Sequence, residues 1–481
     1  RDIVQFYLGP IRTYLIVGPQ NVQALFRNTK SPALSSQKFS LMAMENLMCY
    51  TKEDVGKFAR DKTGRLAEPN EGTAATHQGP RLWYGMHHHS KTLAQNATTS
   101  ALTEKFVEFF DERVQEYPLG EEVTVNLYQF MRTKMAGAAI KALAGNALFE
   151  RVGEEKLLDA FWAYDSIVMR LLYSLPKWLD PEPWRIRARA SDLCLDWLQN
   201  DFDAVAEPLS EENDVDWHPV MGNRFMRESL VWYKKEGLCD TSRAGQVLGN
   251  LLGLNANSIP MAAWALIELI QDKSLWNTVR EEAESAVEVN QETGKRNLNA
   301  QKLMSLPMLQ ALYVEILRLH VSVNVTREVV APTAIIAGYK LPQSSLVQAP
   351  TRIAHYNEKA WGRADHPASE FWPYRHIKYV TAQGENGKVT EKPVFVMAAG
   401  PSDFFPYGGG VSMCPGRHFA KQEIVAAVAL MVVTFDIEMV EWVSLDGKTK
   451  SDRPAQEDPK YSGSAAMPPD RDMKVRWRRL A

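Results

Sequence analysis

The sequence predicts a mainly α-helical protein with a small β region. Apolar residues recur at helical spacing from about residue 100 to residue 320. Strand-like segments rich in β-branched and aromatic residues lie toward both ends, at 3–18 around a turn at Gly9 and at 327–342. The sequence shows no internal repeat and no linker-like segment. We therefore expect residues 1–481 to form one domain, with a β region built from both ends of the chain.

The composition is that of an ordinary globular protein and excludes several classes of partner. The chain has 55 basic and 58 acidic residues, so no excess of positive charge indicates a nucleic-acid binder. The cysteines lie far apart and form no CxxC pair, which argues against a disulfide framework and against a zinc or iron-sulfur site. No uninterrupted apolar stretch is long enough to cross a bilayer. We expect that any leader or membrane anchor has been removed or was never present.

The stretch "YGGGVSMCPGRHFA", residues 407–420, places Cys414 between glycines and an apolar helix. Apolar residues continue at helical spacing from Phe419, so Cys414 is expected at a helix N-terminus. Free N–H groups and the helix dipole there favour an anion, and the thiolate is the form of cysteine that binds metals. The residues alone leave two alternatives to a metal ligand open. In the first, Cys414 is a small buried thiol before a core helix, and in the second it is a nucleophile.

This stretch resembles the heme-binding loop of the cytochrome P450 family. The resemblance lies in the order of Tyr407, Gly408, Gly410, Cys414 and Gly416, with an alanine six residues past the cysteine. In that family the cysteine thiolate is the axial ligand of the heme iron. The resemblance implies a cytochrome P450 fold with a long central helix over the heme. It also implies heme b, iron protoporphyrin IX, as cofactor and Cys414 as the metal ligand, with the other four residues at the cofactor.

Two further motifs follow the order found in that family. Glu315 and Arg318 in "ALYVEILRLH" match its ExxR motif, and Arg375 in "FWPYRHI" matches the arginine of the next segment. The resemblance implies that these three residues form a buried ion network that braces the heme loop. Taken alone, a glutamate and an arginine three residues apart on a helix are more typical of a solvated surface pair.

Three other residues resemble partners of the heme propionates. Arg327 follows the ExxR helix as the family's arginine does. Trp83 lies where the family carries a W-x-x-x-R motif, and His87 occupies the arginine position of that motif. The resemblance implies that all three bind the cofactor. We expect His88 and His89 to be solvated, because consecutive residues of a helix point in different directions.

Residues 244–272 are expected to form the family's long helix over the heme, roughly 43 Å at about 1.5 Å per residue. Family members usually carry an acid and a threonine there, but this chain has Ala256 and Asn257, followed by Ser258. Pro260 displaces the carbonyl of Ala256, four residues earlier. We expect these three residues to hold water and relay protons. The phrase "NANSIPMAAW" resembles the branch of sterol 7-alpha-hydroxylase and prostacyclin synthase, and a fungal group that shares it.

Substrate contacts are inferred from the positions where the family lines its pocket. Most of these residues are small or apolar, which favours a hydrophobic substrate such as a terpenoid, a steroid or another secondary metabolite. The predicted substrate-binding residues are Leu251, Leu254, Asn255, Ser322, Val323, Asn324, Val325, Ser464 and Ala465.

The resemblance implies a heme-thiolate monooxygenase that uses dioxygen and electrons from NADPH, received through NADPH-cytochrome P450 reductase. Because the acid and the threonine are missing, a second hypothesis stays open. It is a heme-thiolate isomerase or dehydratase that acts on a peroxide-type substrate without a reductase. A third hypothesis is a non-catalytic heme-binding sensor or carrier, which would have no need of a polar kinked helix over the heme.

The resemblance also implies a location and a docking face. Family members of eukaryotes are held at the endoplasmic reticulum membrane by an N-terminal helix, which this chain lacks, with the catalytic domain facing the cytosol. We expect a monomer. Arg417 and Lys421 lie on the cysteine side and are the predicted contacts for the acidic reductase.

Overall fold

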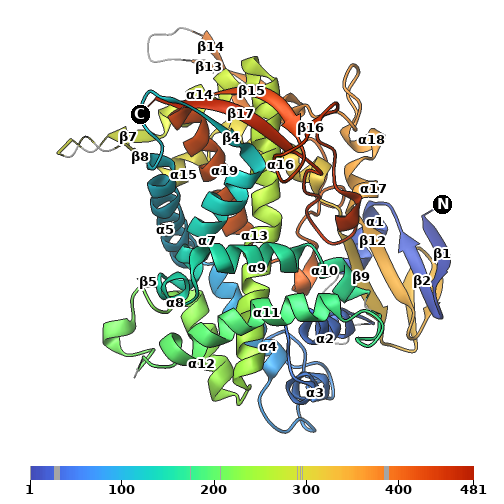
Figure 1. The fold of residues 1–481 in the computed structure, drawn as a ribbon. Helices are drawn as coiled ribbons and strands as arrows, with labels where there is room; N and C mark the ends of the chain where they lie inside the picture. Colours follow the sequence, from blue (N-terminus) through green and yellow to red (C-terminus); the bar gives the residue numbers. More distant parts are fainter. Residues whose placement is uncertain are drawn as a thin grey trace.

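The structure is a computed structural model that describes residues 2–26, 33–173, 175–205, 207–289, 291–292, 294, 296–383 and 389–480. Helices form most of the molecule, and the β region lies mainly along one side and one end (Figure 1). The helices are α1 Pro19–Phe26, α2 Gln37–Asn46, α3 Lys52–Arg60, α4 Leu82–Ser90, α5 Asn96–Gln115, α6 Leu127–Phe130, α7 Ala136–Ala144, α8 Ala147–Val152, α9 Glu154–Asp165, α10 Val168–Leu172, α11 Glu182–Trp197, α12 Arg224–Lys235, α13 Asp240–Gln271, α14 Lys273–Ser285, α15 Ala300–Leu303, α16 Pro307–His320, α17 Thr351–His355, α18 Glu358–Trp361 and α19 Arg417–Thr434.

The strands fall into two larger sheets and several hairpins. The first sheet has the order β1-β2-β12-β9-β3 and the second has the order β16-β15-β17-β4. The strands are β1 Ile3–Leu8, β2 Ile11–Ile16, β3 Leu34–Ser35, β4 Glu122–Asn126, β5 Trp217–His218, β6 Gly222–Asn223, β7 Val287–Val289, β8 Arg296–Leu298, β9 Asn324–Val329, β10 Thr333–Ile336, β11 Tyr339–Pro342, β12 Leu346–Pro350, β13 Ile377–Gln383, β14 Val389–Phe395, β15 Phe435–Val443, β16 Lys450–Ser451 and β17 Asp472–Arg479.

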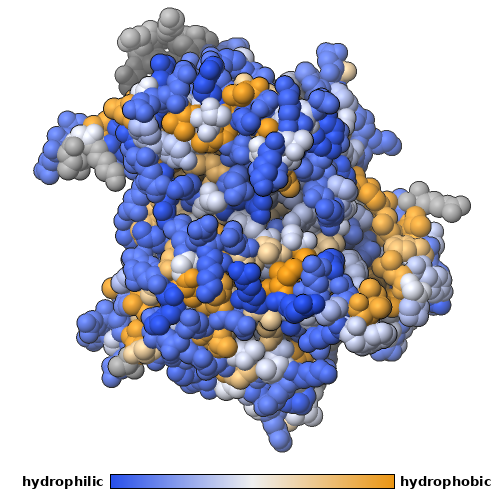
Figure 2. All heavy atoms as spheres, in the orientation of Figure 1, coloured by the Kyte–Doolittle hydropathy of each residue, from blue (hydrophilic) through white to orange (hydrophobic). Residues whose placement is uncertain are grey.

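The first sheet confirms that the β region is built from both ends of the chain. β1 and β2 form the predicted hairpin, with Leu8 opposite Ile11. β12 then pairs with β2 in parallel and with β9 in antiparallel orientation. The N-terminal hairpin is thereby joined to the strands that follow α16. Figure 2 shows hydrophobic residues gathered on the surface of this sheet, and Val4, Tyr7, Leu8 and Ile11 are exposed there.

The long helix expected over the heme is α13, and it runs through the centre of the molecule (Figure 1). It has 32 residues and begins four residues before the predicted start, at Asp240. Pro260 lies inside it, and the helix continues on both sides of the proline. α13 packs against α11, α19, α16 and α7, so most of its second half is buried. This central place puts its polar residues inside the protein.

α19 is the helix that follows the cysteine loop. It begins at Arg417 with Gly416 as its N-cap, so Pro415 lies just before the helix. From Glu423 to Thr434 every residue of α19 is buried. The helix packs against α5, α13 and α14, which holds the start of the helix, and with it Cys414, at a defined place beside α13.

Candidate functional site

A cavity of about 510 Å³ lies between α13, the cysteine loop and the start of α19. Cys414 lines it together with Phe419, Ala420 and Ile424 of α19. α13 contributes residues whose positions differ alternately by three and by one. Residues with this spacing lie on one face of a helix. These residues are Gln246, Gly249, Asn250, Gly253, Leu254, Asn257, Ser258 and Met261. The cavity therefore joins the predicted metal ligand to the predicted proton-relay segment.

Backbone contacts hold the cysteine loop in shape. The N–H of Cys414 donates to the carbonyl oxygen of Tyr407 at 3.1 Å, and the Arg417 guanidinium donates to the carbonyl oxygen of Cys414 at 3.1 Å. Gly408 and Gly410 have φ angles of 68° and 67°, which glycine adopts without strain. Gly408 and Gly416 line the cavity with Cys414 and Tyr407. The loop thus turns the cysteine side chain toward the hollow.

The Cys414 side chain is exposed, but the surface that it exposes faces the cavity. Because protein atoms enclose it, burial raises the pKa of the thiol. The backbone N–H groups of Gly416 and Arg417 and the charge of Arg417 act in the opposite direction without overcoming burial. The start of the helix therefore acts in the predicted direction, toward the thiolate, while burial acts against it. A bound cation favours the thiolate further.

Tyr407 also contacts the ExxR helix. Its hydroxyl lies 2.6 Å from the hydroxyl of Tyr313 on α16, and Tyr313 is buried. Burial raises the pKa of both phenols, so each stays protonated. This pair ties the cysteine loop to the helix that carries Glu315.

Glu315, Arg318 and Arg375 form the predicted ion network. The Arg318 guanidinium donates to both carboxylate oxygens of Glu315, at 2.9 and 2.8 Å, and Arg375 Nε donates to one of them at 2.8 Å. The side chains of all three are fully buried. Burial by itself raises the pKa of Glu315, but the hydrogen bonds and the two positive charges lower it to about 2. Glu315 is therefore a stable carboxylate.

The network extends beyond the three predicted residues. His376 Nε2 lies 3.3 Å from Glu315, and the backbone N–H of Trp372 donates to Glu315 at 3.0 Å. Arg318 and Arg375 both donate to the carbonyl oxygen of Glu370, at 3.2 and 2.9 Å. His376 was missed by the sequence analysis, although it follows Arg375 directly. Every charge in this network has a partner, which is what a buried ion pair needs to be stable.

Two arginines face the hollow near the cysteine loop, and only one of them was predicted. Arg327 is 9% exposed and donates to the carbonyl oxygen of Gly409 at 3.3 Å. Arg65 lines the main cavity, and burial together with repulsion from Arg327 lowers its pKa to about 10. A buried guanidinium that is repelled by a second cation favours an anion close to it. The sequence analysis missed Arg65 because it lies in a loop far from the other motifs.

Arg327 and Gly410 do not line the main cavity. They line an adjoining hollow of about 500 Å³, which shares Arg65 and Ser412 with it. Arg65 therefore lies where the two hollows meet, and a ligand with a carboxylate directed toward Arg65 would also approach Arg327.

His87 lines the cavity as predicted, but Trp83 does not. The indole N–H of Trp83 donates to the carbonyl oxygen of Phe58 at 2.9 Å, and its ring packs under the Arg65 guanidinium at 5.2 Å. The indole donor of Trp83 is used inside the core in this structure, and the contact of Trp83 with the cofactor stays a prediction. Burial, with the nearby charges of Lys91 and Arg65, lowers the pKa of His87 to about 4, so His87 is neutral.

On α13, the face that borders the cavity differs from the predicted one. Leu254, Asn257 and Ser258 line it, whereas Leu251, Asn255 and Ala256 do not. Helical periodicity explains the difference, since the latter three fall outside the stripe that meets the hollow. Asn255 donates to the carbonyl oxygen of Leu251 at 3.0 Å, within its own helix. Leu251, Asn255 and Ala256 therefore lie off the face that borders the cavity, and their roles at the site stay predictions.

The segment after α16 and the C-terminal loop meet each other at the edge of the cavity. Val321 pairs with Ala466 and Val323 pairs with Gly463, and Val323, Ala465 and Ala466 line the hollow. The other predicted contacts do not line it. Ser322 and Ser464 are held by backbone interactions, Asn324 packs beside Gly463, and Val325 lies in the core of the first sheet. Alternation along the segment after α16 turns Ser322 and Asn324 away from the side that Val323 faces.

A residue that no motif singled out also lines the cavity. Glu423 of α19 is fully buried, and neither of its carboxyl oxygens makes a hydrogen bond within the described residues. Among the described residues that line the cavity, no other carries a carboxyl group. A motif search had no reason to select it, because it looks like one more polar residue of a helix.

These residues fit heme b. Cys414 offers a sulfur ligand for iron, the cavity is lined largely by apolar side chains, and Arg65 and Arg327 offer positive charge for carboxylates.

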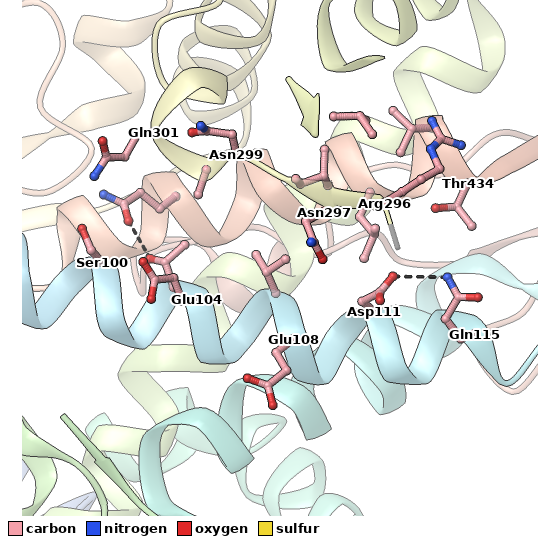
Figure 3. A pocket seen from close by; sticks show the side chains of 18 residues that line it. Ser100, Glu104, Glu108, Asp111, Gln115, Arg296, Asn297, Asn299, Gln301 and Thr434 are labelled. Atoms are coloured by element: carbon pink, nitrogen blue, oxygen red, sulfur yellow. Dashed lines mark hydrogen bonds between the residues drawn. The ribbon is translucent and has the colours of Figure 1, made fainter. Parts of the chain in front are cut away.

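Figure 3 shows a second hollow of about 550 Å³, bordered by α5, the segment from Arg296 to Gln301 and a different face of α19. No cysteine or histidine is found among the described residues that line it. Only the cavity at Cys414 therefore offers a thiol to iron among these hollows.

Comparisons with known proteins agree with this site. The family model of cytochrome P450 matches residues 2–452. Cytochrome P450 monooxygenase calL of Penicillium decumbens is 42% identical, over 99% of this chain and 86% of its own length. Cytochrome P450 monooxygenase fsoE of Humicola fuscoatra is 28% identical over 74% of this chain and 62% of its own length. The 7-alpha-hydroxycholest-4-en-3-one 12-alpha-hydroxylase of Oryctolagus cuniculus is 24% identical over 73% and 66%.

Solved structures confirm the fold that the sequence predicted. The heme domain of cytochrome P450DA covers 100% of this chain and 90% of its own with a TM-score of 0.62 at 15% identity. The retinoic acid-bound cyanobacterial CYP120A1 covers 100% and 92% with a TM-score of 0.64 at 18% identity. Low identity with high coverage means that the arrangement of helices is shared although most side chains differ.

Proposed function

The chain belongs to the cytochrome P450 family, and from this premise we propose a heme-thiolate monooxygenase of fungal secondary metabolism that oxidises a hydrophobic small molecule. The observation that carries the proposal is Cys414 in the wall of a largely apolar cavity that also meets the polar middle of α13. Electrons are proposed to come from NADPH through NADPH-cytochrome P450 reductase. Heme b, when bound, supplies the chemistry that activates dioxygen.

The chain's own residues bind the cofactor, hold the site rigid and exclude water. When heme is bound, Cys414 would hold the iron, Arg65 and Arg327 would hold the propionates by charge, and neutral His87 would donate a hydrogen bond. Glu315 and its cationic partners fix α16 to the segment around Arg375, so the floor of the site is rigid. Apolar side chains on α19 and α13 exclude water from the cavity.

The lining of the cavity supports a hydrophobic substrate. Leu254, Met261, Val323 and Ala465 are among the residues that would contact it, and they offer no charge to pair with. A terpenoid, a steroid or another lipophilic secondary metabolite fits this lining. Asn257 holds the position of the loop above it, because its side-chain oxygen accepts from the N–H of Ala466 at 3.2 Å.

Two surfaces support the proposed partners. Arg417 lies at the cysteine loop and Lys421 one turn later, and they offer positive charge to an acidic reductase. At the β1–β2 hairpin, exposed Val4, Tyr7 and Leu8 support contact with the endoplasmic reticulum membrane, with the catalytic domain, as a monomer, facing the cytosol (Figure 2). In the part of the chain that the structure describes, no helix has the length and apolar character to cross a bilayer.

One departure from the usual sequence of the family supports a second candidate function. α13 carries Ala256 and Asn257 where an acid and a threonine usually lie, and this favours a heme-thiolate isomerase or dehydratase that acts on a peroxide-type substrate. Such an enzyme needs neither NADPH nor a reductase. Turnover of a substrate hydroperoxide alone would support it, and turnover that requires NADPH and reductase would exclude it.

The proposed function is tested by spectroscopy followed by product analysis. We expect the reduced, CO-treated protein to show the thiolate-type absorption band, and Cys414→Ala to lose it. Cys239→Ala is the matched control, because Cys239 is an exposed cysteine that does not line the cavity. Lipophilic fungal metabolites are then screened for a shift of the heme spin state, and products are compared with and without reductase. A band that survives Cys414→Ala contradicts the proposal.

A further inference from the structure

The cavity at Cys414 extends to a second end, at α12, that the proposed chemistry does not use. Asn250 of α13 contacts Met226 of α12 there, whereas Ser258, about two turns further along α13, faces Glu423 of α19. At 1.5 Å per residue the two positions on α13 lie roughly 12 Å apart. The cavity therefore runs along α13 from the Cys414 end, beside α19, to the α12 end (Figure 1).

A chain of hydrogen bonds reaches the cavity wall at the α12 end. The Tyr50 hydroxyl donates to Gln246 Oε1 at 2.9 Å, and Gln246 Nε2 donates to Asn250 Oδ1 at 2.8 Å. Asn250 Nδ2 then donates to Met226 Sδ at 3.7 Å. Gln246 and Asn250 are half-buried and line the cavity, whereas Tyr50 is 4% exposed. The chain therefore runs from the core to the cavity wall.

The contacts at its two ends set the direction of this chain. Burial raises the pKa of the Tyr50 phenol, so the phenol keeps its proton and can donate it. At the other end, the thioether sulfur of Met226 can only accept. An Asn250 amide turned the other way would place its oxygen against that sulfur, where neither atom donates. Asn250 therefore ends the chain with N–H groups.

The protein does not satisfy the donors at the α12 end. A thioether is a weak acceptor, and the remaining N–H groups of Asn250 and Gln246 have no acceptor among the described residues. Ser229 of α12 also lines the cavity, and its buried hydroxyl oxygen has no hydrogen-bond partner in the described part of the chain. A purely apolar substrate that displaced water here would leave these groups unpaired, which weakens binding. A substrate that brings an oxygen acceptor avoids this loss.

The oxygen that fits the α12 end is a neutral one. Arg65 lines the cavity close to Arg327, at the cysteine loop, and Glu423 faces Ser258. Both ionisable groups thus belong to the Cys414 end, and His87 is neutral. A carboxylate or an ammonium group of a substrate would find no counter-ion at α12 among the described residues that line the cavity. Burying such an unpaired charge is costly, so a neutral acceptor is favoured.

Between the two ends, α13 leaves room for an apolar body. Gly253 is exposed although it lies in the middle of the central helix, and a Cβ placed on it would meet no atom within 4 Å. Because Gly253 lines the cavity, its exposed surface belongs to the cavity wall. Leu254 follows it there, and Phe225 of α12 adds an aromatic ring. These residues suit the hydrocarbon part of a substrate.

We propose that Asn250, positioned by Gln246 and Tyr50, recognises a neutral carbonyl oxygen of the substrate. The inference rests on the proposed monooxygenase function and adds the chemical class of its substrate. That class is a lipophilic molecule with a ketone, ester or lactone carbonyl at the end remote from Cys414. A carbonyl oxygen accepts hydrogen bonds and donates none, which matches the unpaired N–H groups. The part of the substrate held at the Cys414 end then lies on the order of 10 Å from this oxygen.

The first experiment locates the acceptor by its distance from the heme iron. The probes are N-alkylimidazoles of increasing chain length, whose free ring nitrogen binds the iron of the holoprotein. Each chain ends in a methyl ketone or, in its paired probe, in an alkyl group of equal length. Binding is measured from the shift of the heme absorption band, which requires no turnover and no known substrate.

We expect one chain length at which wild type binds the ketone at least about 10-fold more tightly than its alkyl pair. Asn250→Leu, which keeps the size of the side chain and removes its N–H groups, should bring this ratio to within about 2-fold. A ratio near one at every length in wild type overturns the proposal. A high ratio that is unchanged in Asn250→Leu overturns it as well.

Two further comparisons use the same probes. Gln271→Leu is the matched control and should keep the wild-type ratio, because it removes a side-chain amide of α13 that does not line the cavity. A chain that ends in a carboxylate should bind less tightly than the ketone of the same length, since no cation lines the α12 end. Tighter binding of the carboxylate would contradict a neutral acceptor.

The second experiment observes the hydrogen bond itself. Infrared difference spectra are recorded with the preferred ketone probe, with and without an isotope label at its carbonyl carbon. We expect the carbonyl stretch in wild type to lie below its frequency in a hydrocarbon solvent and to return toward that frequency in Asn250→Leu. Gln246→Leu should give an intermediate frequency, because Asn250 then lacks its support. An identical stretch in wild type and in Asn250→Leu overturns the proposal.

Failure of this inference is distinct from failure of the proposed function. If wild type lacks the thiolate-type CO band, or if no imidazole shifts the heme absorption, the heme-thiolate function fails. If the imidazoles bind but the ketone is never preferred, only the recognition of a carbonyl by Asn250 fails.

Discussion

Two carboxyl groups near Cys414 are both fully buried, and the fold treats them in opposite ways. Glu315 on α16 accepts hydrogen bonds from Arg318, Arg375 and the backbone of Trp372. Glu423 on α19 has no hydrogen-bond partner among the described residues. The pKa is lowered to about 2 for the first acid and raised to about 8 for the second.

The difference separates a charge that holds the structure together from an acid that is available for chemistry. A buried carboxylate with several cationic and N–H partners cannot exchange its proton near neutral pH, so Glu315 contributes rigidity. A buried acid beside a cavity keeps its proton and can release it when a nearby group accepts it. Burial alone therefore does not reveal the role of an acidic residue, and the set of its partners does.

The largest expected effect comes from breaking the paired acid. Glu315→Gln leaves the buried charges of Arg318 and Arg375 without a carboxylate, and we expect it to lower the free energy of unfolding by about 3–5 kcal/mol. Heme incorporation should fall with it, as measured by the thiolate-type CO band. Unfolding of the purified holoprotein in denaturant measures the change. A loss below about 1 kcal/mol would show that the network is dispensable.

The same substitution at Glu423 should not destabilise the protein and should remove a pH dependence. Because the pKa of Glu423 is raised above the ordinary 4.5, its contribution to stability is full below about pH 4.5 and is lost as pH rises through about 8. The slope is at most about 1.4 kcal/mol per pH unit. We expect unfolding curves of Glu423→Gln to lack this alkaline decline. If the two proteins decline in parallel, Glu423 does not hold its proton in the folded state.

The pH dependence of Glu315 has the opposite sign. Its pKa is lowered, so the stability that it contributes is present above about pH 4.5 and is lost as pH falls through about 2. Acid unfolding followed in wild type and in Glu315→Gln measures this contribution, and the variant should lose the corresponding part of the transition.

A smaller effect is expected from Arg65. This buried cation complements the comparison of the two buried acids. Removing a guanidinium that repels Arg327 should not weaken the fold, but it should weaken the hold on the propionates by about 1.5–3 kcal/mol. We expect Arg65→Gln to speed transfer of heme to excess apomyoglobin by about 10-fold or more. Arg65→Lys keeps the charge and is the matched control. Equal transfer rates for wild type and Arg65→Gln would exclude Arg65 from the cofactor site.

The smallest effect is expected at an acid that is paired but exposed. Glu116 contacts Arg113 and Lys134 on the surface, and its side chain is 44% exposed. Water screens such a cluster, so Glu116→Gln should change the free energy of unfolding by less than about 1 kcal/mol. Denaturant unfolding beside Glu315→Gln shows the contrast. A loss as large as that of Glu315→Gln would mean that burial is not what makes the inner network strong.

The parts of the site that could be predicted are those defined by the spacing of residues close together in the sequence. The glycines and Cys414, the Glu315 and Arg318 pair and the hairpin at 3–16 all depend on residues that are close in sequence. Arg65, His376 and Glu423 could not be found in this way, because each acquires its role from neighbours far along the chain. Leu251 and Asn255 were inferred from the family's pocket positions and do not line the cavity here, because only the packing of α13 decides which stripe of the helix meets the hollow.

The sequence by itself determined the family, the loop that carries Cys414 and the acid and arginines of the inner network. These follow from short motifs whose spacing suffices to identify them. Only the tertiary structure decided that Trp83 turns into the core, that Arg65 faces the hollow and that Glu423 is buried without a partner. The physical reason is that burial and pairing depend on all the elements packed around a residue, and packing brings together segments that lie far apart in the chain.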